Sequence, residues 1–142
     1  SMRLEKSYRL IPREMSIEYS AYESGLDRFV RLDKENDFIG KEALKDWQER
    51  GAVNGFVTME VIGVVDADAR GSEAIYKDGM VVGRGTSGGY GWRCGKSLAL
   101  GIVRKDLTAV GTELEIEILG EKYKSIVIDE SPFDPNNQCL RS

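Results

Sequence analysis

The sequence predicts a mainly β protein, in which a small, Greek-key-like closed β-barrel of about six strands follows a short α+β segment. Residues 112–118 alternate strictly between polar and apolar side chains, which is typical of a strand with one buried face. Asp78-Gly79 separates two apolar runs, and this pair is a strong hairpin signal because both turn positions accept a positive φ. Several short strands joined by tight turns favour a closed barrel over an open sheet with unpaired edges.

The segment before the barrel is predicted to contain one clear helix. Residues 1–10 resemble the tail of a helix, and after Gly25 the pair Phe29-Val30 is expected to enter a short strand. Residues 41–50 predict a helix that Gly51 ends. We therefore expect a boundary between residues 1–50 and a barrel domain of residues 51–142.

Six apolar runs are the predicted strands of the barrel. In the fifth run, Leu114, Ile116 and Ile118 are expected to point inward, with glutamates between them facing solvent. The runs are 56–61, 74–76, 80–82, 98–103, 112–118 and 123–128.

Glycines crowd the segment 83–91, between two of the predicted strands. Because glycine weakens regular structure and accepts turns, an irregular loop is expected there. Residues 83–88 fit the letters of the GxGxxG phosphate-binding pattern, but the following Gly-Tyr-Gly-Trp cannot open the helix that such a site needs. A loop joining two strands of a small barrel is the simpler interpretation.

Composition excludes several classes of function. The net charge is −4 and no basic block occurs, so nucleic acid is not an expected partner. No apolar run approaches the roughly 20 residues of a membrane span, so a membrane is not expected either. The chain has no histidine, the commonest general base and metal ligand, and its two cysteines, read as free thiols, cannot complete a zinc site. No metal site is predicted.

Four motifs occur in order along nearly the whole chain. They are Arg3-Leu4-Glu5 followed by Tyr8-Arg9, the run DFIGKEAL at 37–44, the pattern VGxxTSG at 82–88 followed by KSLALGIV at 96–103, and the tail SPFDPNN at 131–137. In this order they resemble the C-terminal part of the glycine-cleavage T-protein (aminomethyltransferase) family. The resemblance is strongest to the T-like half of dimethylglycine and sarcosine dehydrogenases.

The resemblance implies a fragment of a tetrahydrofolate-dependent enzyme. Such an enzyme passes a one-carbon unit to tetrahydrofolate from an N-methyl amine such as dimethylglycine or sarcosine, or from an aminomethyl-lipoyl protein. Residues 1–50 would be the C-terminal remnant of the folate-binding domain, and 51–142 the C-terminal barrel. Missing N-terminal domains would be its partners, with FAD bound in one of them in the dehydrogenases. The expected location is the cytoplasm, or the mitochondrial matrix of a eukaryote.

The resemblance also assigns two folate-binding residues. Arg3 matches the arginine that faces the folate pocket, and its planar guanidinium suits a carboxylate or a ring carbonyl. Gln138 stands where the family has a tyrosine that touches folate; it retains hydrogen-bonding capacity but cannot stack. The family's catalytic aspartate lies in the N-terminal half, so no catalytic residue is predicted here. The chain would form one wall of the folate site.

A chain cut from a larger protein would expose an apolar face, expected around Leu4, Tyr8, Leu10 and Trp47, and such a face favours self-association. Two other functions remain open. One is a non-catalytic barrel module for domain assembly or partner docking. The other is a folate-dependent demethylase or RNA-modifying relative.

Overall fold

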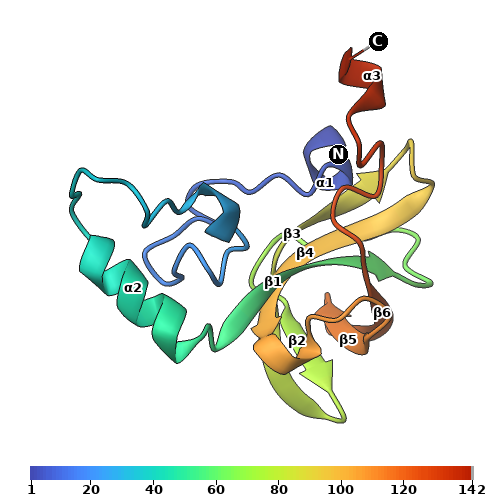
Figure 1. The fold of residues 1–142 in the computed structure, drawn as a ribbon. Helices are drawn as coiled ribbons and strands as arrows, with labels where there is room; N and C mark the ends of the chain where they lie inside the picture. Colours follow the sequence, from blue (N-terminus) through green and yellow to red (C-terminus); the bar gives the residue numbers. More distant parts are fainter. Residues whose placement is uncertain (142) are drawn as a thin grey trace.

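The computed structural model describes residues 1–141, in which six antiparallel strands close into a barrel, as predicted (Figure 1). The strands are β1 (Asn54–Val61), β2 (Ala74–Lys77), β3 (Met80–Gly91), β4 (Lys96–Arg104), β5 (Glu113–Ile118) and β6 (Glu121–Ile128). Around the barrel they follow the order β1-β4-β3-β2-β5-β6. Hairpins join β2, β3 and β4 in succession and β1 lies beside β4, which is a Greek-key arrangement.

The predicted hairpin between β2 and β3 is confirmed. Asp78 and Gly79 have φ values of 52° and 78°, the left-handed pair that suits a two-residue turn between twisted strands. The inward alternation of β5 is confirmed as well, because Leu114, Ile116 and Ile118 are at most 2% exposed. These three side chains belong to the cluster of apolar residues that fills the barrel.

The outer face of β1 and β4 is also buried. Phe56, Leu98, Leu100 and Ile102 form a second apolar cluster with Leu4, from the short helix α1 (Met2–Glu5). The prediction that Leu4 lies on an exposed face was therefore wrong, because the N-terminal segment folds back over these two strands and covers them. Strands buried on both faces carry nearly continuous apolar sequence, as β4 does.

The glycine-rich segment is not the irregular loop that its composition predicts, because residues 83–91 all lie in β3. Close packing explains why. A Cβ atom on Gly83 would lie 2.7 Å from the Val103 Cα atom, and one on Gly88 would lie 2.6 Å from the Ala69 carbonyl oxygen. Glycine here allows close backbone approach rather than a turn. The strand is bulged between Gly85 and Ser87, where its register with β4 shifts.

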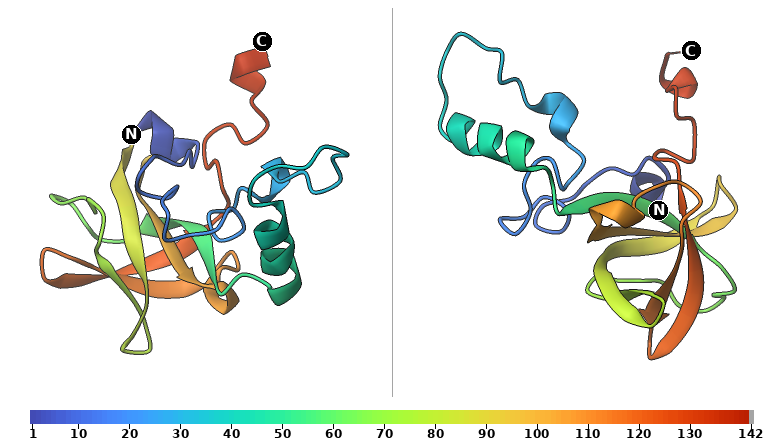
Figure 2. Two further views of the ribbon diagram at one scale, coloured as in Figure 1. Left: turned by 90° about the vertical axis from the view of Figure 1, so that its left-hand side faces the viewer. Right: turned by 60° about the horizontal axis from the view of Figure 1, so that its bottom comes forward.

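Residues 1–53 contain short helices and no strand. The strand expected at Phe29-Val30 is instead the end of the 3-10 turn η1 (Asp27–Phe29), in which the Val30 N–H bonds back to Asp27. The predicted helix is confirmed as α2 (Lys41–Arg50), and none of its residues is buried. It stands off to one side of the barrel in each view (Figure 2). Within residues 1–141, no helix has both the length and the apolar character needed to cross a bilayer.

Two further short helices complete the described chain. The 3-10 turn η2 (Lys105–Leu107) follows β4, and α3 (Gln138–Arg141) ends the C-terminal tail. The tail returns from β6 to run beside α1, so both ends of the chain lie on the same side of the barrel (Figure 1).

Candidate functional site

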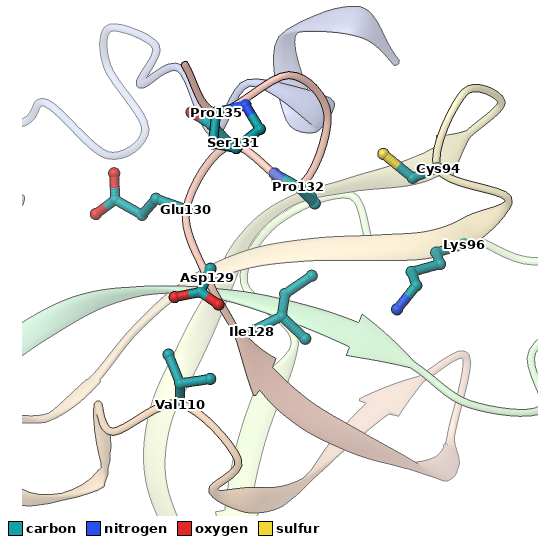
Figure 3. A pocket seen from close by; sticks show the side chains of 9 residues that line it. All are labelled: Cys94, Lys96, Val110, Ile128, Asp129, Glu130, Ser131, Pro132 and Pro135. Atoms are coloured by element: carbon teal, nitrogen blue, oxygen red, sulfur yellow. The ribbon is translucent and has the colours of Figure 1, made fainter.

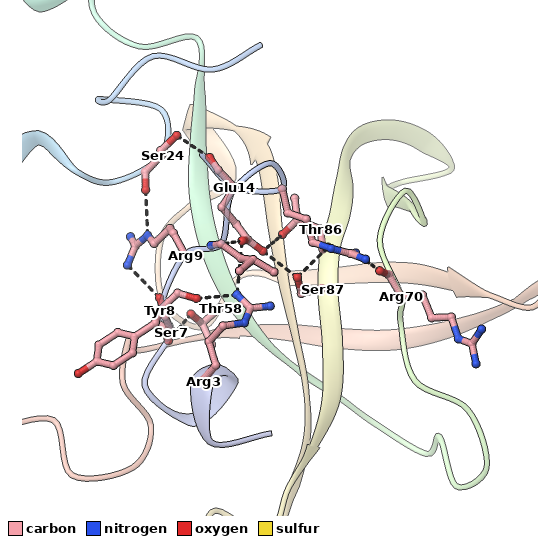
Figure 4. A network of polar contacts seen from close by, with 12 residues as sticks. Arg3, Ser7, Tyr8, Arg9, Glu14, Ser24, Thr58, Arg70, Thr86 and Ser87 are labelled. Atoms are coloured by element: carbon pink, nitrogen blue, oxygen red, sulfur yellow. Dashed lines mark hydrogen bonds and ion pairs between the residues drawn. The ribbon is translucent and has the colours of Figure 1, made fainter. Parts of the chain in front are cut away.

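A fully buried carboxylate joins the N-terminal segment to the barrel (Figure 4). The Thr86 and Ser87 hydroxyls, from the bulged part of β3, donate to Glu14 Oε1 at 2.5 and 2.9 Å. The backbone N–H of Leu10 donates to Oε2 at 2.8 Å. The bulge matters here because it lets two adjacent hydroxyl groups reach the same carboxylate oxygen, whereas successive side chains of a regular strand point to opposite faces.

Arg3 lies beside this carboxylate. Its Nη1 atom donates to the Tyr8 carbonyl oxygen at 2.6 Å and lies 3.4 Å from Glu14 Oε2. The side chain is 29% exposed, so it does not point into bulk water. Its Nε and Nη2 atoms have no acceptor among residues 1–141. Arg3 is thus fixed at one edge of its guanidinium and open at the other.

The surroundings of Glu14 keep it ionised. Burial alone would raise the pKa of this carboxyl, but the hydrogen bonds from Thr86, Leu10 and Ser87 and the charge of Arg3 outweigh burial and hold the pKa below its ordinary value. Glu14 therefore presents a negative charge to Arg3 at neutral pH. A buried carboxylate with this many donors positions its neighbours rather than exchanging protons.

A second set of contacts fastens the C-terminal tail to the residues that follow α1. Lys6 Nζ donates to the Asp134 carbonyl oxygen at 2.6 Å and to Asn137 Oδ1 at 2.8 Å. The Ser131 N–H donates to Ser7 Oγ at 3.0 Å, and that hydroxyl also bonds Thr58 of β1. The tail, the N-terminus and the barrel therefore form one hydrogen-bonded unit.

The second predicted folate residue lies at the start of α3. Gln138 is exposed, and its N–H bonds to Asp134 Oδ1 at 2.7 Å. Within the described chain, no hydrogen bond or ion pair links Gln138 to Arg3. Asn137, which precedes Gln138, contacts Lys6, and Lys6 lies three residues after Arg3 in the chain. Gln138 and Arg3 therefore lie on neighbouring segments but do not contact each other.

A cavity of about 720 Å³ lies between the end of β6, the tail and the β3–β4 hairpin (Figure 3). Neither Arg3 nor Gln138 lines it. Its Lys96 is paired with Glu60 at 2.5 Å. Burial raises the pKa of the Cys94 thiol, with a further contribution from Glu5, so the thiol is protonated at neutral pH and is a poor nucleophile. Among residues 1–141, no group of acidic or cysteine side chains is placed to hold a metal ion.

The sequence did not single out Glu14 as a site residue. In the sequence, Thr86 and Ser87 stand out only as letters of a motif, and 72 residues separate Glu14 from Thr86. The available signal was two adjacent hydroxyl residues inside a glycine-rich strand, where an outward hydroxyl needs a partner if something covers it. Nothing in the local sequence indicated which acid would supply that partner.

Comparison with known proteins gives a matching family model, relatives with similar sequences and a solved structure with a similar fold. Residues 54–134 match the model of the glycine cleavage T-protein C-terminal barrel domain. The chain is 40% identical over 130 residues to human mitochondrial dimethylglycine dehydrogenase, covering 92% of this chain and 15% of that protein. It is 33% identical over 133 residues to the aminomethyltransferase of Rippkaea orientalis, covering 94% of this chain and 35% of that protein.

A solved structure supports the same fold. The crystal structure of glycine cleavage system aminomethyltransferase T from Bartonella henselae superposes with a TM-score of 0.84 at 21% identity, covering 94% of this chain and 37% of that one. The chain therefore spans between about a seventh and about a third of the length of the proteins it matches.

Proposed function

Because the chain belongs to the family of the glycine cleavage T-protein C-terminal barrel domain, we propose that it is the C-terminal part of a tetrahydrofolate-dependent aminomethyltransferase-like enzyme and forms one wall of the folate site. Residues 1–50 are the end of the folate-binding domain, and residues 51–142 are the barrel domain. The upstream domains supply the remaining walls and the groups that move protons. If the parent is a dehydrogenase fusion, FAD belongs to one of those domains.

The partly anchored guanidinium of Arg3 is the observation that carries this proposal. A guanidinium offers two parallel N–H groups to a carboxylate or a carbonyl-bearing ring. In Arg3 one nitrogen is fixed by Tyr8 and Glu14, and the other two have no acceptor among the described residues. An arginine positioned in this way is ready to bind a ligand without first losing much side-chain freedom. Gln138 is the second proposed contact and contributes a hydrogen bond.

The segment of residues 17–50, which lies beside the barrel and exposes several apolar side chains, supports the proposal of further domains. The helix α2 buries none of its residues. Ile17 and Ile39 are fully exposed, and Phe29 is 67% exposed. Apolar side chains gathered on one segment usually mark a contact surface. In the larger protein, this segment packs against the upstream part of the folate-binding domain.

The donor of the one-carbon unit is an N-methyl amine such as dimethylglycine or sarcosine, or an aminomethyl-lipoyl protein. Identity to dimethylglycine dehydrogenases, at 40% for the human protein, favours the amine. The enzyme acts in the cytoplasm, or in the mitochondrial matrix if the source is a eukaryote.

The test is calorimetric titration of the full-length protein with 5-formyltetrahydrofolate. Arg3→Ala is expected to weaken binding by about tenfold or more, because it removes a charge-assisted contact. The folate affinity of Arg3→Lys should fall between those of the wild type and Arg3→Ala, since an ammonium keeps the charge but lacks the planar fork. Arg104→Ala, which alters an exposed arginine paired with Asp106, is the matched control and should leave the affinity unchanged. Unchanged folate affinity in Arg3→Ala would remove Arg3 from the site.

A non-catalytic barrel module is the second candidate. One observation favours it: within residues 1–141, every buried side-chain nitrogen and oxygen already has a hydrogen-bond partner. Such a unit is complete without a ligand. If the full-length protein bound no reduced folate while the barrel remained necessary for its assembly, this second function would replace the first.

A further inference from the structure

A second pocket, lined by arginines, lies beside Thr86, the residue whose hydroxyl binds Glu14. Its volume is about 540 Å³, and it opens where the N-terminal segment crosses β3. Arg13, Arg70 and Arg84 all line it. The pocket is separate from the cavity beside β6, with which it shares no lining residue.

Arg13 forms one side of the pocket and is held by backbone oxygens. Its Nη1 atom donates to the Thr86 carbonyl oxygen at 2.8 Å and to the Arg70 carbonyl oxygen. Its Nε and Nη2 atoms have no acceptor among residues 1–141. These contacts position the charge of Arg13 without neutralising it, because carbonyl oxygens carry no net charge.

The glycine at position 71 makes room for this arrangement. A Cβ atom there would lie 2.7 Å from the Thr86 carbonyl oxygen and would clash with Arg13 Nη1. Gly71 also has a φ of 117°, which side chains rarely adopt. Because Gly71 has no side chain, the Arg13 guanidinium can lie against the backbone at Arg70 and at Thr86.

The other charges around the pocket leave Arg70 and Arg13 as its two open cations. Arg84 is paired with the Glu18 carboxylate and stacks on a tyrosine ring. The Glu73 carboxylate accepts the backbone N–H groups of Arg70 and Gly71 at 2.6 and 2.7 Å. The side chain of Arg70 is exposed and has no partner among the described residues.

A site with two arginines requires the Arg70 side chain to change rotamer. Figure 4 shows its side chain extending away from the Glu14 network, while its carbonyl oxygen is bonded to Arg13. Changes of side-chain rotamer on binding are common even where the backbone moves little. The Ser72 hydroxyl lies on the same rim and makes no hydrogen bond to residues 1–141.

We propose that this pocket binds an anionic group, a carboxylate or a phosphate, held between Arg13 and Arg70 with the Ser72 hydroxyl as an additional donor. Guanidinium groups pair with both kinds of anion through two parallel N–H bonds, so both share the recognition chemistry. A ligand with several such anions gains most, because one of its charges can pair with Arg13 and another with Arg70. The proposal does not depend on folate binding at Arg3.

The experiment titrates the full-length protein with tri-γ-glutamate and, separately, with tripolyphosphate at low ionic strength. Arg70→Gln is the main variant, because Arg70 makes no side-chain contact that folding depends on. It is expected to weaken binding of at least one probe by about tenfold. Arg13→Gln should weaken binding as well. Arg104→Gln, with the same charge change at an exposed arginine at the end of β4, should bind like the wild type.

The two probes distinguish the source of the anion. If Arg70→Gln loses affinity for tri-γ-glutamate alone, the natural ligand is a chain of carboxylates. If it loses affinity for tripolyphosphate alone, the ligand is a phosphate. If it loses affinity for both probes, the result supports the chemistry that the two anions share. The proposal is overturned if neither probe binds saturably, if Arg70→Gln binds like the wild type, or if Arg104→Gln loses as much affinity as Arg70→Gln. Folate binding measured on the same variants stays a separate result, because none of them alters Arg3.

Discussion

Replacing Glu14 with glutamine tests whether the buried carboxylate holds the N-terminal segment on the barrel. Glutamine has nearly the same shape, so the substitution changes charge and hydrogen bonding rather than packing. Its oxygen can still accept the N–H of Leu10 and the Arg3 guanidinium. Its NH₂ group then faces Thr86 and Ser87, where the carboxylate had accepted two hydroxyl protons.

The expected cost follows from those contacts. Ser87 can turn its proton to the Thr86 carbonyl oxygen, 2.8 Å away, and accept from the new NH₂ group. The Thr86 hydroxyl has no comparable alternative and loses its acceptor. An orphaned buried hydroxyl costs about 1–3 kcal/mol, and a neutral acceptor in place of a charged one loses about 1 kcal/mol. We expect the free energy of unfolding to fall by about 2–4 kcal/mol at pH 7.

The same contacts predict a dependence on pH. The pKa of Glu14 in the folded chain lies below its ordinary value of 4.5, so its ionised form is the one that folding favours. Its contribution to stability is complete above pH 4.5 and is lost as the pH falls through the folded-state pKa. The stability gap between the wild type and Glu14→Gln should therefore be widest at neutral pH and should narrow on acidification.

Urea unfolding followed by circular dichroism, at pH 7 and at pH 3, measures both effects. Glu115→Gln is the matched control, because Glu115 is exposed on β5 and its side chain makes no hydrogen bond or ion pair to residues 1–141. It should unfold like the wild type at pH 7. The reasoning is refuted if Glu14→Gln unfolds at the same urea concentration as Glu115→Gln, or if its deficit is as large at pH 3 as at pH 7.

Two further substitutions test the packing of the barrel and of the segment that covers it. Gly88→Ala should lower the free energy of unfolding by about 1–3 kcal/mol, because its Cβ atom would lie 2.6 Å from the Ala69 carbonyl oxygen. Gly89→Ala should cost less in the same thermal melts, since its nearest contact is the end of one leucine side chain, and equal costs would contradict the packing argument. Arg9→Ala should cost about 2–4 kcal/mol, because Arg9 is 5% exposed and donates to both oxygens of Glu130 at 2.7 and 2.9 Å. A double-mutant cycle with Glu130→Ala checks this, and additive effects would show that the pair is not coupled.

The barrel was predictable because its signals are local. The alternation of β5 needs only the period of a strand and one buried face, and Leu114, Ile116 and Ile118 are buried as that period requires. The hairpin at Asp78-Gly79 is a property of two adjacent residues that accept positive φ. Strand number and closure follow from several such signals in succession, and the matched motifs identified the family.

The glycine-rich strand and the Glu14 network were not predictable in the same way. Glycines at 83–91 favour a loop on local grounds, whereas in the folded chain glycine is needed in this strand because the Ile102–Val103 backbone and Ala69 lie too close for a side chain at Gly83 and Gly88. Burial of Leu4 likewise depends on the N-terminal segment crossing β1 and β4.

The sequence by itself determined the number of strands and the hairpin at Asp78-Gly79, because each of these signals depends on residues within a few positions of one another, and the order of four motifs along the chain identified the family. Tertiary structure alone decided that Glu14 meets Thr86 across 72 positions and that Arg3 lies beside them. The physical reason is that such contacts depend on register and on how a covering segment crosses the sheet. Those features are set by the whole set of packed neighbours, and no short stretch of sequence encodes them.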